Sequence, residues 1–256
     1  MKQLSFGVLY LFYRVISLVW QPRTVVALMY HSVSDEDWEF ATPSEEFDRQ
    51  IGYLRDQGFS CISVSDVAQW LRREKEIPRR SVLITFDDGY RDFYTSALPI
   101  LRKYHSTATV FIHTNRSSDP LGNSIEVLSW EDVRAISRVG IEIGDHSHGH
   151  PNMKDLSALE LEKEITVSKE KFQAELGLIP TTFAYPGGKF NATISSYLAR
   201  SGYTSAFSIS RGLLSRSDDP FTLRRFGLSR NVSWLEFKAR LTPVSDWYEF
   251  LIKLVS

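Results

Sequence analysis

Short apolar segments alternate with longer amphipathic segments along most of this chain. The apolar segments predict strands at residues 24–30, 59–63, 82–86, 108–113, 140–144, 181–185, 204–209 and 222–228. Helical patterns lie between most of these strands and after the last of them, at residues 44–57, 65–75, 93–104, 130–138, 157–176, 191–202, 233–240 and 244–254. Because strands that alternate with helices form a mostly parallel sheet, we expect an α/β fold. The number of strand candidates is compatible with a (β/α) barrel, including an imperfect one.

The length and composition of the chain indicate one catalytic-sized domain, which we assign to residues 23–256. No internal repeat or Gly/Ser-rich linker divides it, and a hydrophobic content of 43% supports a full core. The net charge of −1 implies no general affinity for nucleic acid. Cys61 is the single cysteine, which excludes an internal disulfide and a cysteine-rich zinc site, so we expect it to pack as a small apolar residue.

Residues 1–22 predict a separate apolar helix, which Arg14 interrupts. The segment is near the lower length limit for crossing a bilayer, and an arginine at mid-membrane would be costly. Two interpretations stay open: residues 1–20 lie on the membrane surface, or they form an ordinary buried first helix. The sequence favours a membrane-associated or cell-envelope location and leaves a cytoplasmic one open.

The strand predicted at 82–86 ends in two adjacent carboxylates, within the sequence V-L-I-T-F-D-D-G at 82–89. Like charges at the end of a buried strand repel each other and resist desolvation, so they need solvent or a nearby positive charge. One interpretation is a solvated Asp-Asp-Gly turn. The other is a metal site at the carboxyl end of a barrel strand, where such folds keep their chemistry.

A second polar cluster, D-H-S-H-G-H-P at 145–151, follows another predicted strand. His146 and His150 are four residues apart, which places both rings on one side of a helical turn or tight loop. Histidine nitrogens are common metal donors, although an isolated pair at this spacing is often only a pair of surface histidines. Two histidines and one carboxylate leave positions open on a divalent ion, which is typical of a catalytic site. We expect His148, between the pair, to point elsewhere.

Three further features lie near predicted strand ends. The sequence F-A-Y-P-G-G at 183–188 is either a plain turn or a place where a backbone N–H faces a developing oxyanion, since its glycines allow close approach of a ligand. His31 directly follows the first predicted strand, where a lone histidine is more often structural. Arg225 lies in the sequence L-R-R-F-G, near the last strand.

The motifs, in this order and with this spacing, resemble those of the polysaccharide deacetylases, the NodB-homology domains of carbohydrate esterase family 4. The T-F-D-D-G sequence at 85–89 resembles their first motif, H-S-H-G-H-P at 146–151 their second, and F-A-Y-P-G-G their third. The sequence L-M-Y-H at 28–31 and the segment 47–59 resemble the branch that contains the poly-N-acetylglucosamine deacetylases. The likeness covers roughly residues 24–230.

The resemblance implies a distorted (β/α) barrel of the NodB type and a metal-dependent sugar N-deacetylase. By position, Asp88, His146 and His150 would hold one divalent ion, usually zinc, with cobalt, nickel and iron(II) also compatible. Asp87 would be the general base that takes a proton from a water activated by the metal, and the Tyr185 backbone N–H would stabilise the oxyanion. The products would be acetate and a free amine on the sugar.

Two departures from the family pattern bear on the remaining roles. The arginine that many members carry in the third motif is replaced here by Ala184, and the chain has no histidine after His150 to match their late catalytic acid. The branch resembles a circular permutation of the other family members, in which an element that comes late in them comes first. We therefore assign the role of the catalytic acid to His31. We expect Arg225 to replace the missing arginine by pairing with Asp87.

The leading hypothesis is an enzyme that removes N-acetyl groups from an acetamido sugar in a polysaccharide or glycolipid, including a lipid-linked glycan. Trp38 and Phe40, on the loop after His31, would then stack on a sugar ring or serve only as edge packing. The alternative is a catalytically impaired carbohydrate-binding protein on the same fold, which the two departures motivate. A metal hydrolase that acts on an amide outside sugars would share the same chemistry.

Overall fold

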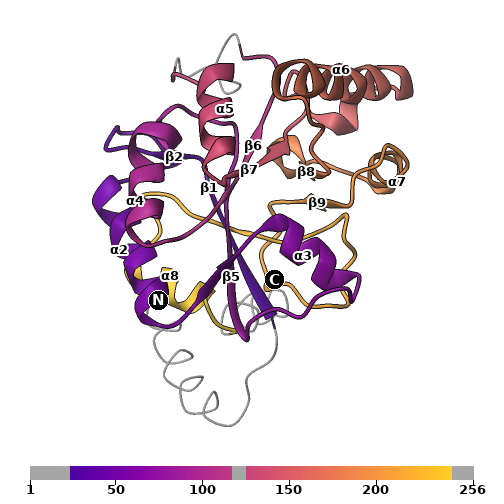
Figure 1. Ribbon diagram of the computed structural model, residues 1–256. Coiled ribbons are helices and arrows are strands. Elements are labelled where there is room, and N and C mark those ends of the chain that lie inside the picture. The colour runs from indigo at the N-terminus through magenta and orange to yellow at the C-terminus, as the bar shows by residue number, and fades with distance from the viewer. Residues whose placement is uncertain (1–23, 117–124, 244–256) are drawn as a thin grey trace.

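A computed structural model describes residues 24–116 and 125–243 of the chain (Figure 1). The predicted N-terminal helix, the helical pattern at 244–254 and the outer limits of the predicted domain lie outside these ranges. Within them, no helix is both long enough and apolar enough to cross a membrane.

The main sheet contains only parallel strand pairs, as the alternation of strands and helices predicts. The strand order is β10-β1-β5-β6-β7-β8-β9, and β4 pairs with the start of β5 while β6 pairs with its end. The bounds are β1 Thr24–Tyr30, β4 Ser60–Ile62, β5 Arg80–Phe86, β6 Thr109–Ile112, β7 Glu142–Asp145, β8 Thr182–Ala184, β9 Ser205–Phe207 and β10 Phe226–Gly227. Every predicted strand has a counterpart here, so the α/β fold class is confirmed.

The segment 220–227 brings the two ends of this sheet together. Its Leu223 bridges in parallel to Phe207 on β9, flanked by backbone hydrogen bonds of 2.8 and 3.0 Å. Three residues later, Phe226 on β10 pairs with β1. The sheet is thereby curled into a distorted (β/α) barrel, which confirms the predicted architecture. Arg225 lies between the two pairings and is fully buried.

Helices connect the strands and surround the sheet (Figure 1). Their bounds are α2 Ser44–Asp56, α3 Val64–Leu71, α4 Leu98–Lys103, α5 Trp130–Arg138, α6 Ala158–Leu176, α7 Ala192–Arg200 and α8 Trp234–Arg240. A π-helical turn, η1 Phe93–Ala97, precedes α4, so the predicted helix at 93–104 begins with an irregular turn. Two-residue strands, β2 Ser32–Val33 and β3 Ala41–Thr42, pair outside the main sheet and were not predicted.

Local sequence sets the ends of several helices. The Ser157 side chain accepts from the Glu160 N–H, and the Glu160 carboxylate accepts from the Ser157 N–H, which makes a capping box at the start of α6. Gly177 ends this helix at φ 69°, a left-handed conformation that glycine adopts without strain. Helix α3 ends before the predicted residue 75, because Arg73 adopts a positive φ of 64° that no helix can continue.

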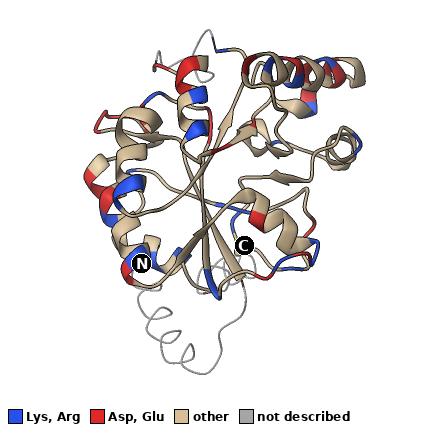
Figure 2. Ribbon diagram, viewed as in Figure 1, with Lys and Arg blue, Asp and Glu red and all other residues tan. Residues whose placement is uncertain are grey.

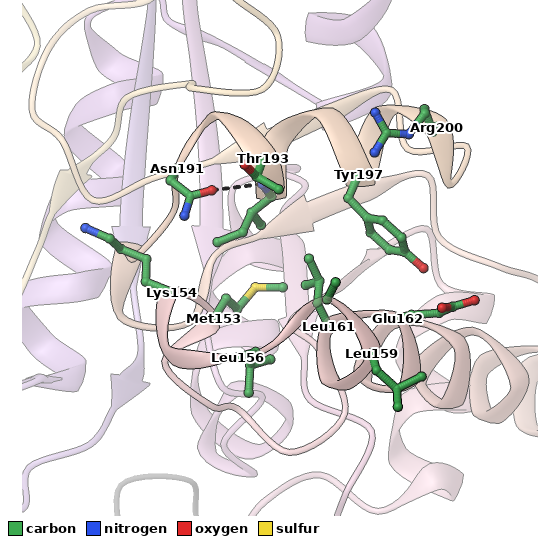
Figure 3. Close-up of a pocket in the computed structure, with 12 residues that line it drawn as sticks. Met153, Lys154, Leu156, Leu159, Leu161, Glu162, Asn191, Thr193, Tyr197 and Arg200 are labelled. Atoms are coloured by element: carbon green, nitrogen blue, oxygen red, sulfur yellow. Dashed lines mark hydrogen bonds between the residues drawn. The ribbon is translucent and has the colours of Figure 1, made fainter.

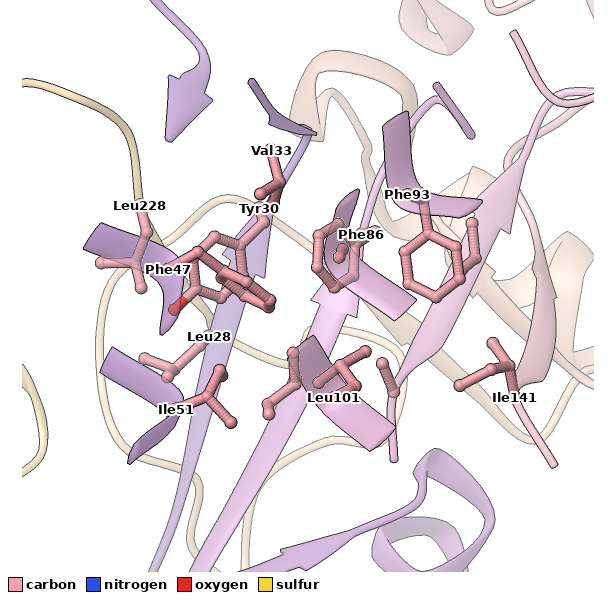
Figure 4. Close-up of a cluster of buried hydrophobic side chains, with 14 of the residues drawn as sticks. Leu28, Tyr30, Val33, Phe47, Ile51, Phe86, Phe93, Leu101, Ile141 and Leu228 are labelled. Carbon is pink, nitrogen blue, oxygen red and sulfur yellow. The ribbon is translucent and has the colours of Figure 1, made fainter. Parts of the chain in front are cut away.

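Alternate side chains of the strands fill two buried layers. The large cluster in Figure 4 lies between the sheet and the helices, and it includes Leu28, Tyr30, Phe47, Phe86 and Leu101. A second cluster contains Ala27 and Leu83 from the other face of β1 and β5, packed with Phe111 and Phe207. Apolar residues thus fill the barrel interior up to the level of the Arg225 guanidinium, which lies 5.5 Å from the Phe111 ring. This packing leaves the carboxyl ends of the strands for polar groups.

Candidate active site

Acidic and basic residues are interspersed along the helices, whereas most residues of each strand are uncharged (Figure 2). Buried ionisable residues gather instead at the carboxyl ends of β5 and β7, where Asp87, Asp88, Asp145 and His146 are each at most 3% exposed. The carboxyl edge of a parallel barrel is where such folds place their reacting groups.

The two adjacent carboxylates point to different partners. Asp87 continues β5, and its N–H donates to the Tyr30 carbonyl on β1 at 2.9 Å. Asp88 then adopts φ 68°, a left-handed conformation that is uncommon for a residue other than glycine and turns the chain away from the strand. Asp87 therefore contacts Arg225, whereas Asp88 contacts two histidines. Because each carboxylate has its own partner, two like charges can be buried side by side.

Arg225 reaches Asp87 from the segment that closes the barrel. Its Nη1 and Nη2 donate to the two carboxylate oxygens at 2.7 Å each, which makes a bidentate pair. Nη1 also donates to Thr85 Oγ1 and Nε to the Ser208 carbonyl, both at 3.1 Å. Burial alone would raise the pKa of Asp87, but the Arg225 guanidinium and His146 outweigh it and hold that pKa below its usual value. Asp87 is therefore an ionised carboxylate in a fixed orientation.

Asp88, His146 and His150 form a three-donor cluster. Asp88 Oδ1 lies 3.3 Å from His146 Nε2 and 3.2 Å from His150 Nε2, and the three donor atoms lie within 4.8 Å of one another. Two donors held at about 2.0–2.1 Å from one ion at a tetrahedral angle would be about 3.3 Å apart, so the spacing fits a divalent ion such as zinc. His146 Nδ1 donates to the Ala184 carbonyl at 2.7 Å, which leaves Nε2 for the ion.

A tight loop, not a helix, brings the two histidines together. Ser147 and His150 adopt positive φ values of 69° and 57°. Asp145 holds the start of the loop: Oδ1 accepts from the Ser147 N–H and the Ser168 hydroxyl, both at 2.8 Å, and Oδ2 accepts from the Tyr203 hydroxyl at 2.5 Å. Burial raises the pKa of Asp145 to about 6, although these hydrogen bonds oppose the rise. Asp145 thus ties the loop to α6 and to the segment before β9.

His31 lies just beyond β1, close enough to Asp87 and Asp88 for both charges to act on its pKa. Burial lowers the pKa of His31, and the two carboxylates only partly offset this effect. The buried Nδ1 atom has no hydrogen-bond partner among the described residues. Asp92 anchors the backbone that follows, because its carboxylate accepts from the Val33 N–H at 3.1 Å.

His148 and two aromatic residues lie at the edges of the site. His148 Nδ1 forms a hydrogen bond of 2.9 Å with Thr114 Oγ1, and this residue is not part of the three-donor cluster. The Phe40 ring lies 4.9 Å from the His31 ring and is 37% exposed, and Trp38 packs edge-on against Phe40 at 5.7 Å. An aromatic surface beside His31 is compatible with edge packing and with sugar stacking.

The structure contradicts the role expected for the Tyr185 backbone N–H. This N–H donates to the Phe207 carbonyl at 3.0 Å, because the parallel pairing of β8 with β9 continues one residue beyond β8. The side chain is fully buried, and its hydroxyl donates to the Phe221 carbonyl at 2.9 Å. Both polar donors of Tyr185 are therefore engaged within the fold. Gly187, two residues later, is exposed and adopts φ 56°.

Arg116 and His113 also lie at the site, although the sequence does not single out a role for them. Arg116 donates to the main-chain carbonyls of Asp88 at 3.2 Å and Gly89 at 2.7 Å. His113, just beyond β6, is 2% exposed, and its ring lies 6.4 Å from that of His150. Neither residue belongs to a motif. The position of β6 between β5 and β7 places both residues at the site. This position is known only once the order of the strands in the sheet is known.

A pocket of about 420 Å³ lies between the start of α6 and helix α7 (Figure 3). Its lining is mainly apolar and includes Met153, Leu156, Leu161, Ile194 and Tyr197, with Lys154 and Arg200 among the polar residues. Asn191 Oδ1 accepts from the Ile194 N–H at 3.0 Å and caps α7 at the edge of this pocket. No residue of the three-donor cluster lines it, so the pocket is separate from that cluster.

Known proteins resemble this chain in sequence and in fold. Residues 74–206 match a family model described as polysaccharide deacetylase. The chain is 29% identical over 222 residues to the protein YxkH of Bacillus subtilis (strain 168), and the match covers 86% of this chain and 76% of that protein. It is 24% identical over 268 residues to the poly-β-1,6-N-acetyl-D-glucosamine N-deacetylase of Escherichia coli (strain K12). That match covers 89% of this chain but only 40% of the Escherichia coli protein. The solved structure of the Streptococcus pyogenes deacetylase PplD in complex with acetate has a TM-score of 0.77 and 26% identity, and the match covers 87% of this chain and 100% of that one.

Proposed function

The chain belongs to the polysaccharide deacetylase family, whose members are hydrolases that remove N-acetyl groups from sugars, and we propose that it does so with a divalent metal ion. One observation carries this proposal: an arginine-paired carboxylate, Asp87, directly precedes a carboxylate that shares a three-donor cluster with two histidines. Hydrolysis of an amide needs an activated water, a stabilised oxyanion and a protonated leaving amine. The described residues offer a candidate for each.

Asp88, His146 and His150 would hold the ion. Three protein donors leave positions open for water and for a substrate oxygen, which distinguishes a catalytic site from a structural one. When bound, a divalent ion would supply a Lewis acid and lower the pKa of a coordinated water toward neutrality. Two imidazoles and one carboxylate suit zinc, and they also suit cobalt, nickel and iron(II).

Asp87 is the proposed general base. Its pairing with Arg225 keeps it ionised, so it can accept a proton at neutral pH without first losing one. The bidentate geometry also fixes the plane of the carboxylate, which limits the directions from which a water can approach its lone pairs. Arg225 thus acts through Asp87 as a positioning residue.

His31 is the proposed proton donor to the leaving amine. An amine departs readily only when it is protonated, so an acid must lie near the scissile bond. His31 comes from the end of β1, near both carboxylates, and its buried Nδ1 is not satisfied by any described residue. Because burial lowers the pKa of His31, the neutral imidazole must first take up a proton, and the imidazolium then passes it easily to the leaving amine.

The proposed backbone donor to the oxyanion is Gly187, in place of Tyr185. Pro186 has no N–H, and the Gly188 N–H donates to the Tyr185 carbonyl at 2.7 Å. The Gly187 N–H has no hydrogen-bond partner in the described part of the chain, and this residue is exposed. A free N–H on an exposed glycine can approach a substrate oxygen closely.

The proposed substrate is an acetamido-sugar polymer or a lipid-linked glycan. Support comes from the Escherichia coli relative, which is named for poly-β-1,6-N-acetyl-D-glucosamine and of which this chain spans 40%. The partly exposed Phe40 ring beside His31 offers an apolar surface of the kind that stacks on a sugar face. Such a substrate would place the enzyme in the cell envelope, and the proposed contact of residues 1–20 with the membrane surface would agree with this location.

The decisive experiment measures acetate release from a panel of N-acetylated glycans, with protein loaded with zinc, cobalt or nickel. We expect release from an N-acetylglucosamine polymer, and a loss of about 10²–10⁴-fold in Asp87→Asn, because the variant lacks the base. Both proteins should bind one metal ion per chain, and the exposed Asp56→Asn variant should match the wild type.

Other outcomes would point to other functions. If folded, metal-loaded wild type released no acetate from any glycan, the carbohydrate-binding alternative would gain support. Release from simple acetamides alone would favour a metal hydrolase that acts outside sugars. Equal turnover by the wild type and Asp87→Asn would remove Asp87 from the mechanism.

A further inference from the structure

The Arg116 side chain donates hydrogen bonds to four carbonyls, which belong to three backbone segments at the carboxyl edge of the sheet. Its Nε donates to the Leu128 carbonyl at 2.9 Å, and Nη1 donates to the carbonyls of Asp88 at 3.2 Å and His113 at 3.1 Å. Nη2 donates to the Gly89 carbonyl at 2.7 Å. The guanidinium therefore holds the turn after β5, the end of β6 and the residues just before α5 in one arrangement.

The turn that Arg116 contacts has an unusual backbone. Asp88 and Gly89 both adopt φ 68°, and two successive left-handed residues are disfavoured when the first carries a side chain. A Cβ atom on Gly89 would lie 2.6 Å from Ile112 Cγ2 and 3.2 Å from Arg116 Nη1, so β6 and the guanidinium lie directly against this turn. A turn of this kind persists only where its surroundings determine it.

The positive charge of Arg116 does not explain why this residue lies beside the three-donor cluster. Burial lowers its pKa to about 10, so the guanidinium stays protonated at neutral pH. A positive charge beside the three-donor cluster opposes the binding of a cation. Its hydrogen bonds to Asp88 and Gly89 go to carbonyl oxygens, not to the Asp88 carboxylate. The planar fork of a guanidinium can bind several carbonyls at once, which the point charge of lysine cannot reproduce.

We propose that Arg116 is a positioning residue that fixes the Asp88–Gly89 turn and thereby sets the directions of two carboxylates. With the turn in place, Asp88 faces the two histidines and Asp87 faces Arg225. Without it, the backbone relaxes toward an ordinary conformation, and the Asp88 carboxylate leaves the cluster. This inference rests on the proposed metal site and adds a residue that touches neither metal nor substrate.

The test compares metal binding by Arg116→Met and Arg116→Lys with that of the wild type. Methionine keeps the aliphatic stem, and lysine keeps the charge, but neither keeps the fork of donors. We expect zinc affinity, measured by competition with a chromophoric chelator, to fall by about 10–100-fold in both variants, as for other residues that orient metal ligands. The visible absorption of the cobalt-loaded variants should change as well, because it reports the geometry of the donors.

Turnover gives a second readout. We expect kcat for acetate release to fall while KM stays close to the wild-type value, because Arg116 does not contact the substrate. In Arg116→Ala, guanidinium chloride at a concentration far below that which unfolds the protein should restore part of the lost zinc affinity. Rescue of this kind is not expected for a side chain that only fills space.

Arg216 provides a matched control. Its guanidinium also binds main-chain carbonyls, those of Trp70 at 2.9 Å and Lys75 at 3.0 Å, but between α3 and β5, away from the carboxyl ends of the strands. Arg216→Met should lower the melting temperature and leave zinc affinity unchanged. This variant separates a general loss of stability from a specific loss of donor geometry.

Wild-type zinc affinity in folded Arg116→Met and Arg116→Lys would overturn the inference, as would a loss no larger than that in Arg216→Met. If the wild type nevertheless bound zinc and released acetate, the proposed function would stand without this role for Arg116. If the wild type bound no zinc, the proposed function and the inference would fail together. Circular dichroism establishes folding, and should Arg116→Met not fold, the lysine variant decides.

Discussion

Asp87 and Asp88 are neighbours in sequence, yet each depends on a partner that lies far along the chain. Asp87 pairs with Arg225, and Asp88 meets His146 and His150. The left-handed conformation of Asp88 sends the two carboxylates in different directions. Removing a partner of one carboxylate should therefore have effects that are distinct from removing a partner of the other.

Arg225→Met tests this separation. The variant leaves a buried carboxylate without its cation, so we expect a loss of about 3–5 kcal/mol in the free energy of unfolding at neutral pH. The pKa of Asp87 should rise, because burial then acts without the arginine that opposes it. The acid limb of the pH–rate profile should move to higher pH, since the base must be deprotonated to act. Urea unfolding and the pH dependence of acetate release measure the two effects.

The double variant Arg225→Met/Asp87→Asn is the control for charge. With no carboxylate left to bury, it should recover much of the stability that Arg225→Met alone loses. Zinc affinity should change little in either protein, because the three donors have other supports. A stability loss that the double variant does not relieve would show that Arg225 acts through packing and not through its charge.

Some residues of the site can be inferred from sequence, and others cannot. Asp88 and the two histidines follow predicted strands, and the carboxyl ends of parallel strands meet at one edge, so their proximity follows from residue type and position. The use of the Tyr185 N–H depends on how far β8 pairs with β9, which residue type does not reveal. Arg116 follows β6 without any motif, and its role depends on the backbone angles of a turn elsewhere in the sequence.

The loop after β7 depends on a buried carboxylate at its start. Asp145 accepts hydrogen bonds from the loop, from α6 and from the segment before β9, and its pKa is raised from 3.8 to about 6. As the pH rises, the Asp145 carboxyl therefore loses its proton at a lower pH in the unfolded chain than in the folded protein. The contribution of Asp145 to folding stability is fully present below about pH 4 and is lost by about pH 6, a difference of about 3 kcal/mol.

Asp145→Asn should remove this dependence. We compare the free energies of unfolding of the metal-free variant and the metal-free wild type. The value for the variant minus the value for the wild type should rise by about 3 kcal/mol between about pH 4 and about pH 7. Urea unfolding at several pH values provides the measurement, and the exposed Asp155→Asn variant provides the control. The same pH dependence in the wild type and Asp145→Asn would show that burial does not raise this pKa.

Elements with strong local signals can be placed accurately from sequence. Helix α6 has both a capping box and a terminal glycine, and its predicted and observed ends agree. Helix α3 has a start signal at Ser63 but no glycine or proline at its end, so its last residues cannot be placed from the apolar pattern. Strands β2 and β3 contain two residues each, and a strand of this length has no alternation to detect.

Across the whole molecule, the proposed metal ion would join β5 to β7 above the end of β6. An ion that binds only the folded protein raises its stability, by about 2.7 kcal/mol when free metal is about 100 times Kd. We expect zinc to raise the melting temperature of the wild type and EDTA to reverse the rise. In Asp88→Ala, which lacks one donor, zinc should have little effect. An unchanged melting temperature of the wild type at saturating zinc would argue against a preformed site.

The segment that closes the barrel also fixes the order in which the parts of the site are made. Asp88, His146 and His150 are all translated before residue 151, whereas Arg225 enters the chain some 75 residues after His150. A growing polypeptide on the ribosome therefore carries every proposed metal donor well before it carries the arginine that orients the base. A chain terminated between residues 150 and 225 would therefore contain all three proposed metal donors without the arginine that orients the proposed base.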